Sequence, residues 1–273
     1  MKAYKLNSGL SIPSVGIGVF RVEDAAIAYD TVKSALSVGY RHIDTAMIYG
    51  NEESVGKAIL DSGVPREEIF LTTKLWNDDQ RKGTVEEAIK LSLKKLGTDY
   101  VDLYLVHWPV KETYVTIWKA MEKVYREGLA KAIGVSNYNI HHLEDLLKET
   151  GTVPVVNQIE CYPYLAQQEL VDYCLSKGIV PEAWGPLGAG KSDVLVNPVI
   201  VELAKKYAKT PAQIVLGWNI QRGLVVIPKS VHRQRQEENL EALNVNLGEE
   251  DLKKITALNK NLRLGSDPDN ITF

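Results

Sequence analysis

Short runs of β-branched and aromatic residues alternate with amphipathic stretches along the whole length of this 273-residue chain. Most of the runs begin roughly 23 to 32 residues after the previous one, about the length of one strand–helix unit. Eight segments are expected to be strands: residues 15–18, 42–44, 69–74, 101–107, 132–136, 155–160, 179–184 and 225–228. Alternation without a linker predicts a parallel sheet, and eight units predict a closed (β/α)8 barrel, the TIM barrel of the α/β class.

We expect the barrel and a few additional elements to form a single domain that covers residues 1–273. The Asn-Ser-Gly turn signal at residues 7–9 lies between two short apolar runs, which predicts an N-terminal hairpin that caps the bottom of the barrel. The longest interval between strands predicts an extra helix at 199–207 ahead of one at 211–222, and another short helix is expected to end near Leu240. The other expected helices include residues 25–38, 85–96, 117–126 and 169–177.

The composition argues against several classes of partner. A net charge of -3 and a pI of about 6.0 offer no basic surface for nucleic acid or for a membrane. The N-terminal segment is too polar for a signal peptide, and no apolar run approaches the roughly 18 residues of a spanning helix. A cytoplasmic location is therefore expected. Cys161 and Cys174 lack metal-ligand spacing, so no metal site is expected, and their role stays open.

Polar residues stand where three consecutive strands are expected to end. In a barrel of this kind, active sites lie at the C-terminal ends of the strands. The second, third and fourth strands end in Asp44, Lys74 and His107, and Tyr49 follows in the loop after the second. Each side chain alone has an ordinary structural explanation, such as a helix cap or core packing. Their convergence on one face favours a shared catalytic role.

These four side chains suit proton transfer to a carbonyl group. The ordinary tyrosine pKa of about 10 is too high for easy proton exchange near neutral pH. A nearby ammonium lowers that pKa, and a carboxylate keeps the ammonium charged in a partly dry site. We therefore predict that Asp44 holds Lys74, that Lys74 lowers the pKa of Tyr49, and that His107 orients the substrate carbonyl.

Three segments of the chain resemble signatures of the aldo-keto reductase superfamily, and the resemblance runs nearly end to end. GYRHIDTAMIYGNEESVG resembles the tetrad-bearing signature, LTTKLW the lysine signature and IPKS the phosphate-binding signature. The resemblance implies that Asp44, Tyr49, Lys74 and His107 form a catalytic tetrad that reduces a carbonyl with hydride from NADPH. Loops and tail resemble the prokaryotic branch that contains glyoxal, methylglyoxal and 2,5-diketo-D-gluconate reductases. The resemblance also implies a monomer.

The expected cofactor site lies in the last third of the chain. A Gly-x-Gly pair at residues 16–18 resembles the start of a Rossmann dinucleotide-binding motif, but Arg21 stands in place of the third glycine. A Rossmann site is therefore not expected there. Loops after the seventh and eighth strands of a barrel often bind phosphate, and residues 227–240 combine cationic side chains with a short helix that Arg235 is expected to open. His232 stands where many relatives have threonine, which leaves the strength of the preference for NADPH over NADH open.

The family pattern assigns the cofactor contacts residue by residue. Lys229, Ser230 and Arg235 would contact the 2′-phosphate, and Glu238 and Asn239 the adenine. Ser136, Asn137 and Gln158 would bind the nicotinamide carboxamide, whereas Trp184 would stack on the nicotinamide ring. The remaining expected cofactor positions are Gly18, Gly185, Leu187 and Val231.

The substrate pocket is expected to be apolar and open. The residues expected to line it are Phe20, Met47, Ile48, Trp76 and Trp108. Each of them alone could be ordinary packing at the barrel rim. The loop after the fourth strand and the C-terminal tail are short, which favours small aldehydes, ketoaldehydes or keto sugars. The physiological substrate stays open.

Two other functions fit the same residues. Lys74 could be the nucleophile of a Schiff-base aldolase, a chemistry that barrels often host. Alternatively, the chain could hold NADPH as a redox sensor without turnover. Borohydride trapping with a carbonyl substrate would identify the aldolase, and tight NADPH binding with negligible reduction would identify the sensor.

Overall fold

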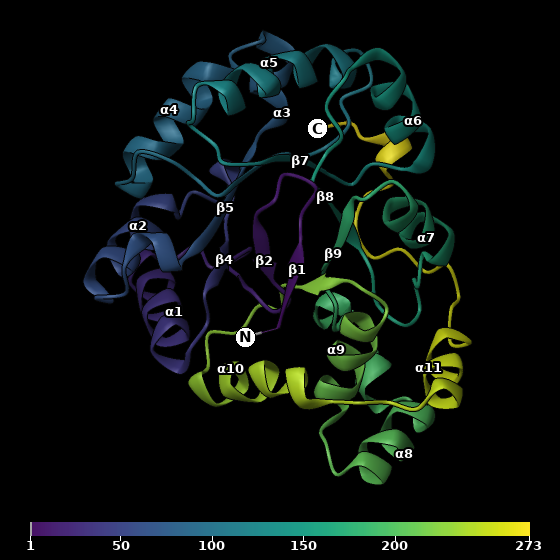
Figure 1. The fold of residues 1–273 in the computed structure, drawn as a ribbon. Helices are drawn as coiled ribbons and strands as arrows, with labels where there is room; N and C mark the ends of the chain where they lie inside the picture. The colour runs from purple at the N-terminus through teal and green to yellow at the C-terminus, as the bar shows by residue number, and fades with distance from the viewer. Residues whose placement is uncertain (1) are drawn as a thin grey trace.

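Eight parallel strands form the centre of the structure, a computed structural model that describes residues 2–273 (Figure 1). The strands are β3 (Ile17–Gly18), β4 (His42–Asp44), β5 (Phe70–Leu75), β6 (Leu103–Val106), β7 (Ile133–Ser136), β8 (Val156–Glu160), β9 (Val180–Trp184) and β10 (Val225–Val226). Each strand pairs with the next in chain order. The sheet closes where Val15 bridges Val226, whose carbonyl oxygen accepts from the Gly16 N–H at 2.8 Å. The predicted closed barrel is confirmed.

An antiparallel hairpin, β1 (Ala3–Lys5) and β2 (Ser11–Pro13), covers the bottom of the barrel (Figure 1). Gly9 in its turn has a φ of 88°, a left-handed value that glycine adopts without strain. Leu6 and Ile12 are buried among inward-facing apolar side chains of β5, β6, β8, β9 and β10. The predicted hairpin cap is therefore confirmed, and it keeps water out of the lower barrel.

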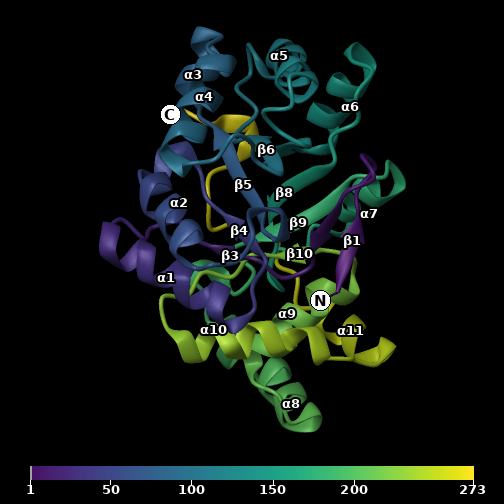
Figure 2. The same ribbon diagram turned by 60° about the vertical axis from the view of Figure 1, so that its left-hand side comes forward.

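Helices on the outside cover the barrel (Figures 1 and 2). The α-helices are α1 (Ala25–Val38), α2 (Glu52–Asp61), α3 (Asn77–Lys82), α4 (Val85–Leu96), α5 (Tyr114–Arg126), α6 (Ile140–Glu149), α7 (Gln168–Ser176), α8 (Pro198–Tyr207), α9 (Pro211–Gln221), α10 (Arg233–Leu240) and α11 (Glu249–Thr256). Short 3-10 helices are η1 (Met47–Tyr49), η2 (Arg66–Glu68), η3 (Gly188–Gly190), η4 (Val194–Val196), η5 (Glu241–Asn244) and η6 (Pro268–Asn270). Within residues 2–273, no helix has both the length and the hydrophobicity to cross a membrane.

The predicted extra helix is confirmed as α8, which packs against α9. Because α8 and η5 cover its outer side, α9 is buried nearly all round, from Gln213 to Ile220. Its start is fixed by a capping box in which the Thr210 hydroxyl accepts from the Gln213 N–H at 3.2 Å, with Pro211 at the first helical position. The capping residues and the burial of the helix therefore both stabilise α9.

Several boundaries differ from the sequence prediction by a few residues. The helix expected to open at Arg235 begins at Arg233, because His232 takes the extended conformation of an N-cap residue. The strand expected at 101–107 is shorter, and Val101 forms a separate bridge with Ala130. The last strand stops before Pro228, which has no N–H to donate to a neighbouring strand.

The interior of the barrel changes from apolar at the bottom to polar at the top. The lower layers are filled by the hairpin and by aliphatic side chains such as Leu105 and Val156. Asp44, Lys74 and Glu182 are buried higher up, at or near the C-terminal ends of their strands. The apolar lower layers therefore exclude water from beneath the buried polar residues. Charge interactions among those polar residues are stronger as a result.

Close packing of α2 on α4 depends on a glycine. A Cβ atom added at Gly56 would lie 2.2 Å from the carbonyl oxygen of Leu96 and 2.7 Å from its Cα. We expect Gly56→Ala to lower the free energy of unfolding by about 1 to 3 kcal/mol, because backbone atoms must move apart. Gly151→Ala is the control, since nothing lies within 4 Å of its added Cβ. Urea denaturation measures both, and equal stabilities would contradict the packing argument.

Candidate active site

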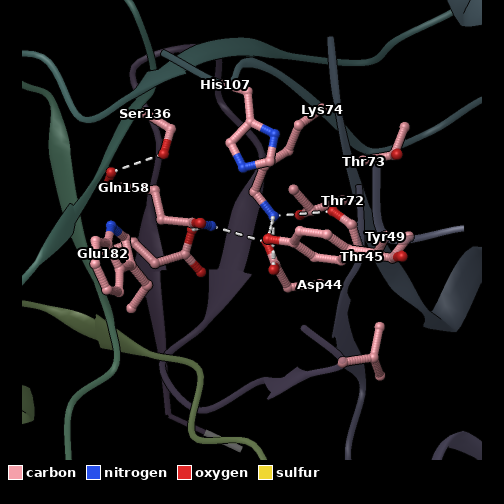
Figure 3. A network of polar contacts seen from close by, with 12 residues as sticks. Asp44, Thr45, Tyr49, Thr72, Thr73, Lys74, His107, Ser136, Gln158 and Glu182 are labelled. Carbon is pink, nitrogen blue, oxygen red and sulfur yellow. Dashed lines mark hydrogen bonds and ion pairs between the residues drawn. The ribbon is translucent and has the colours of Figure 1, made fainter. Parts of the chain in front are cut away.

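The amine of Lys74 is the centre of a hydrogen-bonded group at the mouth of the barrel (Figure 3). Its Nζ donates to Asp44 Oδ1 at 2.7 Å, to the Thr45 carbonyl oxygen at 2.9 Å and to the Tyr49 hydroxyl at 3.4 Å. These contacts use all three donors of the ammonium. The Lys74 and Asp44 side chains are 0% and 3% exposed. The positive charge is thus fixed in position and balanced by one carboxylate.

Strand register explains why these side chains meet. Asp44 of β4 pairs with Thr72 of β5, so Lys74 lies two residues nearer the C-terminal end of β5. Side chains two apart on a strand project to the same side, so Thr72 and Lys74 both face the interior. The Lys74 side chain then reaches sideways to Asp44 on the neighbouring strand. The predicted pairing of Asp44 with Lys74 is present in the structure.

Opposing effects act on the pKa of Lys74. Burial alone lowers this pKa, but the Asp44 charge, the neighbouring Tyr49 side chain and the hydrogen bond to Asp44 raise it, and the net pKa lies above its ordinary value. Lys74 therefore carries its proton at neutral pH. A protonated amine has no free electron pair with which to attack a carbonyl carbon. This state argues against the Schiff-base alternative.

The hydroxyl of Tyr49 faces Lys74 from η1, the turn that follows β4. Its ring packs against Phe20, with the centroids 5.0 Å apart. Burial raises the pKa of Tyr49 more than the Lys74 charge lowers it, so the net pKa lies above 10. Lys74 lowers the pKa of Tyr49, as predicted. The predicted net decrease of this pKa is wrong, because desolvation of the phenolate outweighs the effect of Lys74. Tyr49 is protonated at neutral pH and can donate.

His107 lies beside Tyr49, directly after β6. Its ring meets the Tyr49 and Trp76 rings edge to face, with centroid distances of 5.8 and 5.2 Å. Burial, followed by the Lys74 charge, lowers the pKa of His107 well below its usual range, so the ring is neutral at pH 7. Its Nδ1 is buried without a hydrogen-bond partner among residues 2–273. A neutral imidazole can donate from one of its ring nitrogens, which suits contact with a carbonyl oxygen.

Ser136 and Trp184, the last residues of β7 and β9, form a connected group with Asn137, which directly follows β7. The Trp184 indole N–H donates to Asn137 Oδ1 at 2.8 Å, and Asn137 Nδ2 donates to the His107 carbonyl oxygen at 3.0 Å. Ser136 Oγ donates to the backbone carbonyl of Gln158 at 3.0 Å. Asn137 takes a left-handed backbone with a φ of 64°, which asparagine tolerates better than most residues. The structure therefore brings the expected nicotinamide residues together beside His107.

Gln158 donates from one amide nitrogen to two carboxyl groups. Nε2 lies 2.8 Å from Asp44 Oδ2 and 3.0 Å from Glu182 Oε2 (Figure 3). Glu182 was not predicted from the sequence as a site residue. The available signal was a single acidic residue inside an otherwise apolar strand, which the period of that strand would turn inward.

The expected phosphate segment lies at the N-terminal end of α10. Lys229 and Arg235 are exposed, and neither side chain has a hydrogen bond or ion pair in the part of the chain that the structure describes. Ser230 is buried, and its Oγ accepts from the His232 N–H at 3.2 Å. Asn239 is also buried, whereas Glu238 and Val231 are half-buried. Two uncommitted cations beside a helix N-terminus fit a phosphate dianion.

The three remaining expected cofactor positions, Gly18, Gly185 and Leu187, have different structural constraints. A Cβ atom at Gly18 would lie 2.9 Å from the Ile227 carbonyl oxygen, so closure of the barrel is sufficient reason for glycine there. Gly185 has a φ of 58° directly after β9. Leu187 is half-buried against the main core.

Trp76, Trp108 and Phe273 form an aromatic wall beside His107. Trp76 is stacked on Phe273 with ring centroids 5.8 Å apart and 9° between planes, and Trp108 meets Phe273 edge to face at 5.4 Å. Phe20 covers Tyr49 from the other side and is 54% exposed. The structure thus brings three of the expected pocket residues around the tetrad.

The other two expected pocket residues lie in η1. Met47 is half-buried against the main core, and Ile48 is 47% exposed. Their place in the pocket stays a prediction.

The C-terminal tail reaches the mouth of the barrel (Figure 2). The sequence analysis predicts an open pocket and does not place the tail in it. Glu160 accepts from the N–H groups of Leu264 and Gly265 at 2.8 and 3.0 Å. The Phe273 carbonyl oxygen accepts from Asn77 at 3.1 Å and from Arg81 at 2.7 Å. No local pattern in a short polar tail indicates where it will pack, so only the tertiary structure reveals this wall.

His141, His142 and Asp269 hold the middle of the tail against α6. Their possible ligand atoms lie within 4.8 Å of one another. However, His142 Nδ1 accepts from the Asn139 N–H at 3.1 Å, so in the neutral ring the proton is on Nε2, which faces Asp269. The cluster is accounted for as a hydrogen-bonded tether.

Removing the Asp44 charge should leave the Lys74 ammonium buried without a counter-charge. We expect Asp44→Asn to lower the free energy of unfolding at pH 7 by about 3 to 5 kcal/mol. The double variant Asp44→Asn/Lys74→Met should recover much of this loss, because no charge then remains unpaired. Urea denaturation followed by circular dichroism measures both. Equal losses in the single and double variants would show that the unpaired charge is not the cause.

Comparison with known proteins agrees with this architecture. The Aldo/keto reductase family model matches residues 14–260. Glyoxal reductase of Bacillus subtilis (strain 168) is 49% identical over 269 residues, which cover 98% of this chain and 97% of that protein. Methylglyoxal reductase DkgA of Escherichia coli (strain K12) is 48% identical over 267 residues, covering 97% and 96%.

A solved structure gives the same assignment. MGS-M4, an aldo-keto reductase enzyme from a Medee basin deep-sea metagenome library, has a TM-score of 0.96 and 46% identity, covering 99% of this chain and 100% of that chain. Fold, length and sequence therefore match along nearly the whole chain. The chain belongs to the aldo/keto reductase family and is an oxidoreductase enzyme.

Proposed function

We propose that this enzyme reduces the carbonyl group of small aldehydes, ketoaldehydes or keto sugars to an alcohol, with NADPH as reductant and Tyr49 as proton donor. The observation that carries the proposal is the contact of the Lys74 ammonium with both Asp44 and the Tyr49 hydroxyl. A cation beside a hydroxyl stabilises the oxyanion that remains after proton transfer. The site is therefore suited to deliver a proton to an oxygen atom.

The proposed reaction divides the work among the four side chains. His107 and Tyr49 would hydrogen-bond the carbonyl oxygen and polarise the C=O bond. The bound cofactor supplies a hydride to the carbonyl carbon. The Tyr49 hydroxyl gives its proton to the oxygen, which completes the alcohol, and the resulting phenolate is stabilised by Lys74. Asp44 keeps Lys74 charged throughout. His107 acts as a neutral ring, consistent with its lowered pKa.

The residues fit NADPH at both ends. Lys229 and Arg235 have free cationic groups beside the α10 N-terminus for a 2′-phosphate, with Ser230 next to them. Glu238 and Asn239 lie further along α10 for the adenine. Ser136, Asn137 and Gln158 would bind the carboxamide, and Trp184 would stack on the ring. The other proposed cofactor positions are Gly18, Gly185, Leu187 and Val231.

The aromatic wall favours small substrates. Phe20, Trp76 and Trp108 would line the pocket, together with Met47 and Ile48. Phe273 narrows the same mouth by packing on both tryptophans. Relatives are named as reductases of glyoxal and methylglyoxal, which supports small dicarbonyl compounds as first candidates. Because every proposed group comes from one chain, the proposed enzyme can act as a single-domain monomer.

Tyr49→Phe should abolish most of the reduction. We expect kcat with methylglyoxal and NADPH to fall by about 10² to 10⁴-fold, because the donor proton is lost. The Kd for NADPH, measured by quenching of tryptophan fluorescence, should change little. Tyr125→Phe, on the exposed face of α5, is the matched control. Full activity in Tyr49→Phe would remove Tyr49 from the mechanism, and tight NADPH binding without wild-type turnover would favour the sensor alternative.

Arg235→Ala should weaken the use of NADPH but not of NADH. We expect KM for NADPH to rise by about 10 to 100-fold, the worth of a charged contact with phosphate, and KM for NADH to change less than about twofold. Arg233→Ala is the control on the same helix, since Arg233 is bound to Glu237 and Ser37. Comparable efficiencies of the wild type with NADPH and NADH would contradict the assignment of NADPH.

A further inference from the structure

The orientation of the Gln158 amide is determined by two carboxyl groups. An amide nitrogen carries two hydrogens, and Nε2 of Gln158 directs them to Asp44 and Glu182 at 2.8 and 3.0 Å. Asp44 is already bound to Lys74, so its position is fixed independently. The opposite orientation would place the Gln158 oxygen against two other oxygens. Oε1 of Gln158 must therefore point away from both carboxyl groups.

Glu182 has no other evident role in the barrel. Its side chain is fully buried, and its Oε1 has no hydrogen-bond partner among residues 2–273. His42 Nε2 lies 3.6 Å from that oxygen, and burial lowers the pKa of His42 to about 3, so that ring is neutral. Glu182 thus gains no compensating ion pair. A buried carboxyl group without one needs another reason to stand there.

The charged and titratable groups around Glu182 come from several elements. Asp44 and His42 face it from β4, Lys74 from β5 and Tyr49 from η1, while the amide of Gln158 faces it from β8. Burial, followed by the charge of Asp44, raises the pKa of Glu182 to about 8. At pH 7 the carboxyl group is mostly protonated. The proton belongs on Oε1, because Oε2 accepts from Gln158.

We propose that Glu182 is a positioning residue that fixes the Gln158 amide so that its Oε1 accepts a hydrogen bond from the nicotinamide carboxamide of the cofactor. The proposal rests on the proposed function, in which Gln158 binds that group. Glu182 itself touches neither cofactor nor substrate. It acts through one acceptor oxygen, and its neutral form supplies that oxygen without adding a second negative charge beside Asp44.

Two variants separate the acceptor from the charge. Glu182→Gln keeps an acceptor oxygen for Gln158 and mimics the protonated carboxyl group, whereas Glu182→Met removes the acceptor at similar volume. We expect the Kd for NADPH at pH 7 to rise about tenfold in Glu182→Met, the worth of one well-placed hydrogen bond, and to stay within about twofold in Glu182→Gln. The Kd for 2′,5′-ADP, which lacks nicotinamide, should not change in either variant.

The pH profile of reduction provides a second measurement. Ionised Glu182 raises the pKa of Tyr49, so a neutral side chain at position 182 should let Tyr49 lose its proton at lower pH. The fall of kcat at alkaline pH should therefore shift to lower pH in both variants. The free energy of unfolding should also depend on pH. Because folding raises the pKa of Glu182, the wild type loses stability as the pH rises from the pKa of this carboxyl group in the unfolded chain to about 8. Glu182→Gln should lack this loss.

The possible results distinguish the two proposals. Unchanged NADPH affinity in a folded Glu182→Met, while the wild type binds NADPH and turns over, would overturn the role of Glu182 alone. Weaker 2′,5′-ADP binding in parallel with NADPH would also overturn it, since the effect would then be general. Failure of the wild type to bind NADPH would instead overturn the proposed function. If Glu182→Met does not fold, a rise of the Kd for NADPH by more than about twofold in the folded Glu182→Gln, which keeps the acceptor oxygen, decides against the proposal.

Discussion

The burial of the Lys74 ammonium against Asp44 is the interaction on which the candidate site depends. Removing both charges from water is costly, and an ion pair alone often fails to repay that cost. Here the ammonium has three acceptors and the carboxylate has a second donor in Gln158, so both members of the ion pair are hydrogen-bonded. Such an arrangement requires neighbouring strands that do not move relative to one another. The closed barrel supplies them.

The two ends of the barrel have different tasks. At the bottom, Leu6 and Ile12 of the hairpin seal the interior with apolar side chains. At the top, the same inward positions carry Asp44, Lys74, Gln158 and Glu182. Because water is excluded from below, the charge of Lys74 acts strongly on Tyr49 and His107. The pKa of Tyr49 nevertheless rises, since the same dryness penalises its phenolate. The site therefore favours the protonated donor in the resting enzyme.

Much of this protein could be predicted from its sequence. Eight alternating units gave the barrel, the turn at residues 7–9 gave the hairpin, and strand ends gave Asp44, Lys74 and His107 as neighbours. Each of these depends on local periodicity and on the rule that parallel strands end at one mouth. The start of α10 lies two residues before the predicted one, because a helix cap depends on the backbone conformation of a single residue, His232.

Tertiary structure decided what local pattern cannot express. Phe273 lies on Trp76 and Trp108 because distant residues, Asn77 and Arg81, hold its backbone. Glu182 meets Gln158 only because two neighbouring strands are in register and both side chains face inward. The balance between burial and the Lys74 charge at Tyr49 likewise depends on distances in space. The sequence determined which chemical groups reach the mouth of the barrel, and only the packed structure determined their partners, their exposure and hence their protonation.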